Sequence, residues 1–190
     1  MDKKNRVYMY AFLSKIYNDV LDKEYLEELK QNSDLLELIG ENTKNWFLQT
    51  SLEEIYKESN VDYTTLFLMN AKPIETSIID AKDEILIGLS NPVMQFYFNH
   101  GYELNLGASN LQTPDHIALE FAFMQNLVSK DELQAQKEFL QMHLLNWAVP
   151  YFMAIKKMAV TPLYQDLSDF VIEFLANDFS YIVSELEKEE

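Results

Sequence analysis

The segment TPDHIALEFAFM, residues 113–124, is the stretch that decides the fold class of this 190-residue chain. Thr113 is a typical N-cap, Pro114 suits the first helical position, and Asp115 puts a negative charge in the first turn. The apolar residues that follow cover almost the whole circumference of a helix, which is typical of a helix buried on all sides. The segment therefore predicts a buried helix that begins at Thr113-Pro114 and runs to about Val128.

Two polar residues stand inside this apolar stretch. His116 and Glu120 are four residues apart and so share a helical face. A charged Glu120 in such a helix needs a partner, and His116 is the nearest in sequence. One interpretation is a capped core helix with a single satisfied polar pair. The other is that Asp115 and His116 open onto a groove where a basic peptide meets them.

Helical spacing of apolar residues recurs along the rest of the chain, which has only 4 Gly and 5 Pro to interrupt it. We expect helices at about 2–21, 25–29, 35–39, 42–56, 61–69, 81–89, 92–102, 113–128, 130–145 and 162–186, with a loop at 70–80 and a break or kink at Pro150. The prediction is an all-α fold, a single compact multi-helix domain spanning 1–190. Its candidate hinge, between N- and C-terminal helical halves, is 107–113.

Composition excludes several classes of protein. Hydrophobic residues make up 48% of the chain and aromatic residues 13%, enough for a sizeable core and against disorder. The absence of cysteine excludes disulfides, thiolate catalysis and cysteine-based metal sites. There is no phosphate-binding glycine pattern, and the three histidines lie in separate predicted elements. We expect no cofactor, no metal and no catalytic residues, with an acid–base pair of His116 and Glu120 as the enzymatic alternative.

The formal net charge is −16, from 15 basic and 31 acidic residues. Such a surface repels nucleic-acid phosphates and anionic lipid and attracts basic partners. The plainer interpretation is that the acidity confers solubility. No apolar segment follows the charged N-terminal residues, and none reaches the length of a membrane span. We therefore expect a cytoplasmic protein with no nucleic-acid partner and no membrane insertion.

Two further segments have helical patterns rich in aromatic residues. They are DYTTLFLM (residues 62–69), which is followed by Pro73 and Ser77, and HLLNWAVPYF (residues 143–152). The spacing of Tyr63, Leu66 and Phe67 is typical of residues that face a core. Trp147 and Phe152 are expected in the core as well.

In this order and at these separations, the three segments resemble the TorD-like family of redox-enzyme maturation chaperones, which includes the DmsD and NarJ branches. The matching residues are Tyr63, Leu66-Phe67, Pro73, Ser77, Pro114-Asp115-His116, Glu120, Phe123-Met124, His143, Trp147, Pro150 and Phe152. The match spans about residues 5–180. Pro-Asp-His within its apolar helix is the most specific part.

The resemblance implies an all-α cytoplasmic protein that is not an enzyme. It implies two partners: the twin-arginine signal peptide and the apo-form of an exported molybdopterin oxidoreductase, whose cofactor insertion the chaperone assists. The peptide-binding residues that the resemblance implies are Asp115, His116, Glu120, Tyr63, Leu66 and Phe67. Family members often carry an aromatic residue soon after the loop serine, where this chain has Ile78 and Ile79, so the client type stays open.

Two expectations complete this interpretation. A connection at 107–113 between helical halves permits exchange of the C-terminal half between protomers, which predicts mostly monomer with a minor domain-swapped dimer. The functional alternative is an acidic helical adaptor that binds some other basic peptide segment.

Overall fold

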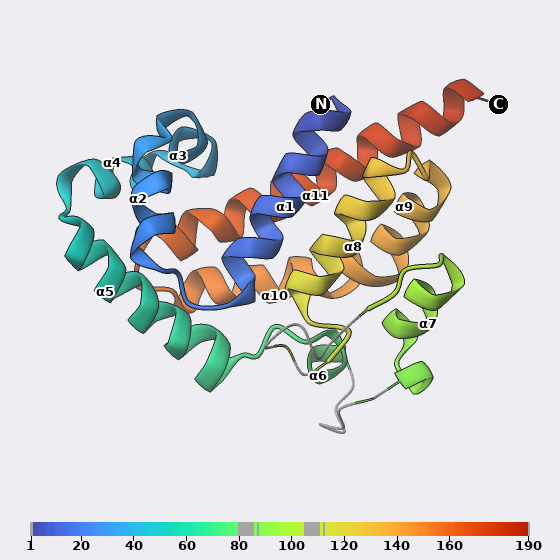
Figure 1. Cartoon of the computed structure of the whole chain (residues 1–190), viewed down its shortest axis with the longest axis horizontal. Coiled ribbons are helices and arrows are strands. Elements are labelled where there is room, and N and C mark those ends of the chain that lie inside the picture. Colours follow the sequence, from blue (N-terminus) through green and yellow to red (C-terminus); the bar gives the residue numbers. More distant parts are fainter. Residues whose placement is uncertain (1, 80–85, 87, 105–110, 112, 190) are drawn as a thin grey trace. The chain divides into compact units, whose positions relative to one another are not determined.

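The computed structural model describes residues 2–79, 86, 88–104, 111 and 113–189. Over these residues the regular elements are helices, and the β-structure is limited to an isolated antiparallel bridge between Ile74 and His116 (Figure 1). The all-α prediction is confirmed. No helix in this part of the chain combines the length and the apolar character that crossing a membrane requires.

The α-helices of the described residues follow one another along the chain in this order. They are α1 (Lys3–Asn18), α2 (Lys23–Gln31), α3 (Ser33–Ile39), α4 (Glu41–Gln49), α5 (Leu52–Tyr63), α6 (Glu75–Ile79), α7 (Pro92–Asn99), α8 (Ile117–Ser129), α9 (Leu133–Phe139), α10 (Leu145–Met158) and α11 (Pro162–Glu189). Two π-helices, η1 (Thr64–Asn70) and η4 (Leu140–Leu144), continue α5 and α9, and a 3₁₀ turn, η2 (Gly88–Ser90), precedes α7.

Side-chain caps begin several of these helices. Asp22 accepts from the Tyr25 N–H at 2.7 Å at the start of α2, and Ser51 accepts from the Glu54 N–H at the start of α5. Asn91 accepts from the Val93 N–H at 2.9 Å, with proline in the first position of α7. Each cap satisfies an N–H that has no partner within its own helix, so these polar residues fix where the helices begin.

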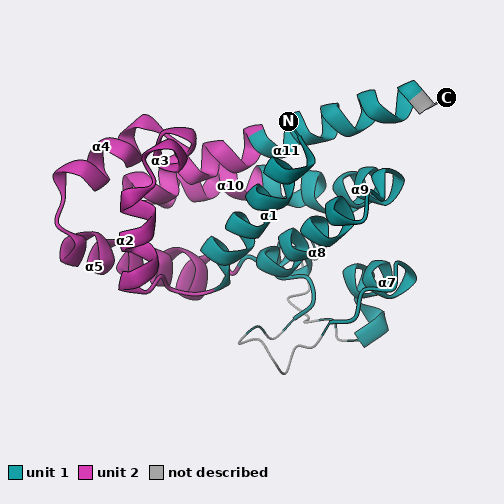
Figure 2. Ribbon diagram, turned by 45° about the horizontal axis from the view of Figure 1, so that its top comes forward, with its two compact units in different colours: residues 1–18, 73–149, 174–190 teal, residues 19–72, 150–173 magenta. Residues whose placement is uncertain are grey.

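Contacts divide the chain into two compact units (Figure 2). Unit 1 consists of residues 1–18, 73–149 and 174–190, and unit 2 of residues 19–72 and 150–173. The helices α10 and α11 therefore contribute residues to both. The predicted hinge at 107–113 lies mostly outside the described residues, so the single domain hinged there stays a prediction.

Aromatic residues fill the core of each unit. In unit 1, Phe123 of α8 contacts Tyr97 and Phe139, with ring centroids 4.5 and 4.8 Å apart. In unit 2, Tyr164 of α11 packs against Tyr63 and Phe67 at 6.1 and 5.4 Å. These rings are fully buried, and rings of this size contribute much of a core's stability.

Unit 1 also contains a buried ion pair between its first and last helices. The Arg6 guanidinium of α1 donates to both carboxylate oxygens of Asp178 in α11, and Tyr10 donates to Asp178 at 2.8 Å. Arg6 also donates to Gln136 at 2.6 Å. Such a pair is held by several hydrogen bonds, as a buried charge must be.

The structure corrects the predicted start of the central helix. Thr113 and Pro114 do not begin it; α8 begins at Ile117 with His116 as its N-cap. The preceding residues pair instead with residues 73–76, which is a long-range contact that local cap signals do not contain. Likewise, the helix predicted at 42–56 is two helices, because Ser51 caps α5.

The structure also differs from the predictions for Pro150 and for the loop at 70–80. Pro150 does not end a helix, because α10 continues through it; Trp147 and Phe152 on either side of it are buried. The predicted loop at 70–80 contains the short helix α6. The helix predicted at 81–89 lies mostly outside the described residues.

Candidate functional site

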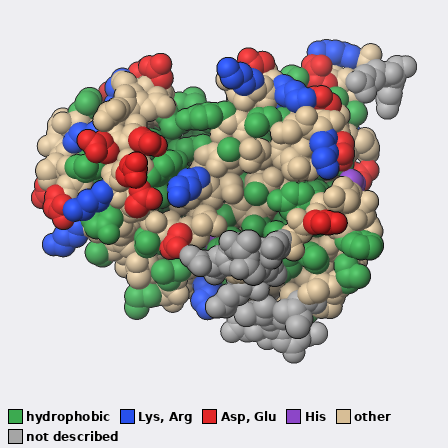
Figure 3. Space-filling model, viewed as in Figure 1, with side chains coloured by type: hydrophobic (Ala, Val, Ile, Leu, Met, Phe, Trp, Pro, Cys, Tyr) green, Lys and Arg blue, Asp and Glu red, His purple; other side chains and the backbone are tan. Residues whose placement is uncertain are grey.

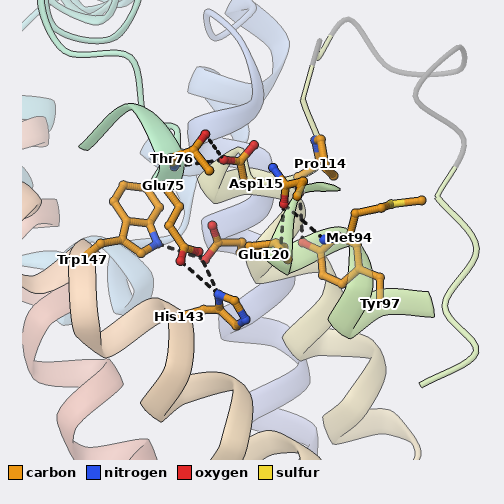
Figure 4. Close-up of polar contacts among 11 residues, drawn as sticks. Glu75, Thr76, Met94, Tyr97, Pro114, Asp115, Glu120, His143 and Trp147 are labelled. Carbon is orange, nitrogen blue, oxygen red and sulfur yellow. Dashed lines mark hydrogen bonds and ion pairs between the residues drawn. The ribbon is translucent and has the colours of Figure 1, made fainter. Parts of the chain in front are cut away.

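The start of α8 is joined to the segment that leads into α6. The Ile117 N–H donates to the Pro73 carbonyl at 2.9 Å, and the Glu75 N–H donates to the Asp115 carbonyl at 3.0 Å. Tyr97 of α7 donates its hydroxyl to the Pro114 carbonyl at 3.2 Å. We call residues 73–76 with 114–117 the clamp (Figure 4). All of it belongs to unit 1.

Asp115 is the central side chain of the clamp. Its Oδ2 accepts from the Thr76 N–H at 3.0 Å and from the Thr76 hydroxyl at 2.6 Å (Figure 4). The carboxylate therefore caps the first turn of α6 from across the clamp. The side chain is 0% exposed. Its other oxygen, Oδ1, has no hydrogen-bond partner among the described residues.

His116 caps the helix that follows it. Its backbone is extended, and its Nδ1 accepts from the Ala118 N–H at 3.3 Å. The residue is 9% exposed. Burial lowers the pKa of His116 to about 4, and the nearby Asp115 opposes this only in part. The imidazole is therefore neutral at neutral pH, as an acceptor nitrogen requires.

Glu120 lies one turn further along α8, fully buried. Its Oε2 accepts from the Trp147 indole N–H at 3.2 Å (Figure 4). Burial raises the pKa of Glu120 well above its usual value, and repulsion from Glu75 raises it further. The carboxyl group is therefore neutral over a pH range in which an exposed glutamate is ionised.

A buried pair of Glu75 and His143 completes the cluster. His143 of η4 places its Nδ1 3.0 Å from both carboxylate oxygens of Glu75 in α6. Both side chains are buried. This pair could not be predicted from the sequence, because the two residues are 68 positions apart and no local pattern connects them.

The predicted partnership of His116 with Glu120 is wrong. His116 is the cap and turns its ring to the backbone, whereas Glu120 bonds to Trp147. The geometry needed for two side chains to meet at four-residue spacing exists only when both lie within the helix. The pair is not arranged as a general acid and base.

The six residues predicted to bind peptide fall into two groups. Asp115, His116 and Glu120 lie around the clamp in unit 1, and the residues predicted from the Leu-Phe segment lie in the core of unit 2. These are Tyr63, Leu66 and Phe67. In this structure all six are buried, and their role in peptide binding stays a prediction.

The cluster around the clamp is closed to solvent. Over the described residues, no group of three or more His, Cys, Asp or Glu side chains is arranged to hold a metal ion. Hydrogen bonds join α6 to the start of α8 and to η4, while two buried oxygens of the cluster, Asp115 Oδ1 and Glu120 Oε1, have no hydrogen-bond partner among the described residues. The bonds fix the segment 73–79 against the start of α8.

Comparison with known proteins identifies relatives over most of the chain. Residues 22–153 match the family described as nitrate reductase delta subunit. A protein named "Chaperone protein TorD" from Shewanella piezotolerans is 22% identical over 88% of this chain and 72% of its own length. A protein of the same name from Aliivibrio salmonicida is 25% identical over 96% of both chains. No solved structure matches.

Proposed function

Because the chain belongs to the nitrate reductase delta subunit family of TorD-like chaperones, we propose that it is a cytoplasmic maturation chaperone. It binds the twin-arginine signal peptide of an exported molybdopterin oxidoreductase. It holds the apo-form of that client and assists cofactor insertion before export. The observation that carries the proposal is the family match over residues 22–153.

The charge of the chain supports this function. A twin-arginine signal presents a basic end followed by an apolar stretch, and the chain carries a formal net charge of −16. Opposite charges speed association and favour the correct partner. Figure 3 shows one face of the molecule, on which acidic and basic side chains are interspersed with apolar ones. An apolar stretch of the signal can be buried against such apolar side chains.

The residues around the clamp have a role of their own in this proposal. Asp115 supports leader binding by holding Thr76 in place, His116 by capping α8, and Glu120 through its bond to Trp147. Tyr63, Leu66 and Phe67 support it by keeping unit 2 packed. Direct contact between Asp115 and a leader requires the segment 73–79 to move away, because Thr76 now covers the Asp115 carboxylate.

The test is capture of the client from its own host. The tagged chaperone is expected to enrich the precursor of an exported molybdoenzyme, and deletion of the client's leader is expected to remove it from the captured set. Recovery of non-exported proteins alone would contradict the proposal. It would favour the alternative, an acidic helical adaptor for another basic segment.

Oligomeric state forms part of the same proposal. We expect mostly monomer with a minor domain-swapped dimer. Light scattering on the purified protein measures this, and an obligate tetramer would contradict it.

A further inference from the structure

Unit 2 contains a cleft of about 410 Å³ beside α5. Its lining comes from α5, from the first turn of η1, from the connection between α10 and α11 and from the first residue of α11. The lining residues are Glu54, Lys57, Glu58, Val61, Asp62, Thr65, Val160, Thr161 and Pro162. We call it the α5 cleft. Its volume lies within the roughly 300–1,000 Å³ of ordinary ligand pockets.

A buried carboxylate fixes the shape of the α5 cleft. Asp62 accepts from the Val160 N–H at 3.1 Å, and its Oδ2 accepts from both the N–H and the hydroxyl of Thr161 at 2.7 Å. These bonds hold the connection between α10 and α11 against α5. The cleft is therefore formed before any ligand arrives, which lowers the entropic cost of binding.

The lining combines apolar surface with negative charge. Val61 is 61% exposed and Val160 is 81% exposed, so the cleft presents aliphatic surface to solvent. Glu54 and Glu58 are four residues apart on α5 and both exposed, with Lys57 between them. Over the described residues none of these three forms an ion pair. With Asp62, three carboxylates and one ammonium line the cleft and leave it net negative.

We propose that the α5 cleft receives the arginine pair of the client's leader peptide. This inference rests on the proposed function and adds the location of one half of the leader. A guanidinium group forms paired hydrogen bonds with carboxylates, here those of Glu54 and Glu58. The apolar stem of an arginine packs on exposed aliphatic side chains, here Val61 and Val160. A ligand without cationic groups would contact the same valines but would form no favourable charge pair with the glutamates.

The test is a double-mutant cycle by calorimetry. The probes are a synthetic leader with two adjacent arginines followed by an apolar stretch, and the same peptide with both arginines replaced by glutamine. The cleft variant is Glu54→Gln/Glu58→Gln. The control is Glu24→Gln/Glu28→Gln on α2, which has the same spacing, the same change in charge and the same start in a first helical turn.

The arginine peptide is expected to bind the cleft variant about 5–10-fold more weakly than wild type, as loss of two partly exposed charge pairs implies. The glutamine peptide should change less than about twofold, and so should the arginine peptide on the control. Lys57→Gln removes a repulsive charge, so it should tighten binding of the arginine peptide.

Each other outcome overturns the assignment. If the cleft variant lost equal affinity for both peptides, Glu54 and Glu58 would not be recognising the arginines. Equal losses in the cleft variant and the control would mean that net charge alone attracts the leader. Unchanged binding in the cleft variant would place the arginines elsewhere and leave the proposed function intact. Failure of wild type to bind either peptide would remove the proposed function together with this inference.

Discussion

Burial moves the pKa values of His116, the N-cap of α8, and of Glu120 within α8 in opposite directions. It lowers the pKa of His116 from 6.5 to about 4 and raises the pKa of Glu120 well above 4.5. Both shifts favour the neutral form, because charge is costly in a poorly solvated place. The two residues therefore reduce stability at opposite ends of the pH range.

Replacing His116 should change the stability of the protein in mild acid. Between about pH 6.5 and 4 the unfolded state binds a proton at His116 that the folded state does not, so stability falls as pH falls. The full loss is up to about 3 kcal/mol. His116→Asn keeps a capping oxygen but does not titrate, so urea unfolding of this variant should lose less stability across that range. An equal loss in variant and wild type would contradict the assignment.

Replacing Glu120 tests a dependence of stability on pH that is opposite to that of His116. The folded state keeps a proton at Glu120 above pH 4.5 that the unfolded state releases, so its contribution is lost as pH rises. Glu120→Gln cannot ionise and still offers an oxygen to Trp147. We expect the stability of this variant to depend less on pH between about 5 and 8, and to equal or exceed wild type at the upper end. Urea midpoints at both ends measure this; a variant as pH-dependent as wild type would count against it.

Asp115→Ala should destabilise the protein because Asp115 caps α6. It leaves the N–H and hydroxyl of Thr76 without their acceptor, at a cost of about 1–3 kcal/mol. Asp115→Asn keeps an acceptor oxygen and should cost less. Phe67→Ala is a reference for a buried side chain, at about 3–5 kcal/mol. Leader titrations on the same variants separate the roles: weakened binding at unchanged stability would indicate direct contact with the peptide.

At the level of the helices, a glycine sets the distance between two elements. A Cβ added at Gly40 would lie 2.7 Å from the Cβ of Asp166 in α11. The Asp166 carboxylate accepts from the Thr43 N–H at 2.7 Å, in the first turn of α4. Any larger side chain at position 40, between α3 and α4, would collide with Asp166, so this position requires glycine.

Gly40→Ala should displace Asp166 and remove the cap of α4. We expect a loss of about 1–3 kcal/mol in urea unfolding. Once Asp166→Gly has removed the Asp166 Cβ together with its carboxylate, adding Gly40→Ala should cost clearly less than it does alone. Full additivity of the two changes would show that the glycine and the aspartate do not compete for space.

Capping residues, prolines and glycines in the sequence correctly predicted those helix ends that neighbouring residues determine. Asn91-Pro92 begins α7, Pro162 begins α11 and Gly40 follows α3, all as expected from capping chemistry. The same chemistry failed at Thr113-Pro114, because those residues lead into a contact with residues 73–76. The network around Glu120 could not be predicted either, since Trp147 is 27 positions away. Buried polar pairs that join distant parts of a chain leave no periodic trace in the sequence.

The charge of the whole chain gives a prediction about salt. A leader with its arginines intact should bind with micromolar or tighter affinity, and more weakly in about 500 mM than in about 50 mM salt, because ions screen attraction to a chain of net charge −16. Calorimetry at both concentrations measures this. The glutamine peptide is the control and should respond less. Salt-independent binding of the arginine peptide would contradict the electrostatic basis of the proposal.

The pairing of Arg6 with Asp178 has a consequence for biosynthesis. The two residues are 172 positions apart, and unit 1 is assembled from three separate stretches of chain. A ribosome that has released α1, and even α8, has not yet supplied the carboxylate that neutralises Arg6. The contact between Arg6 and Asp178 in unit 1 can therefore form only after residue 178 of α11 has left the exit tunnel.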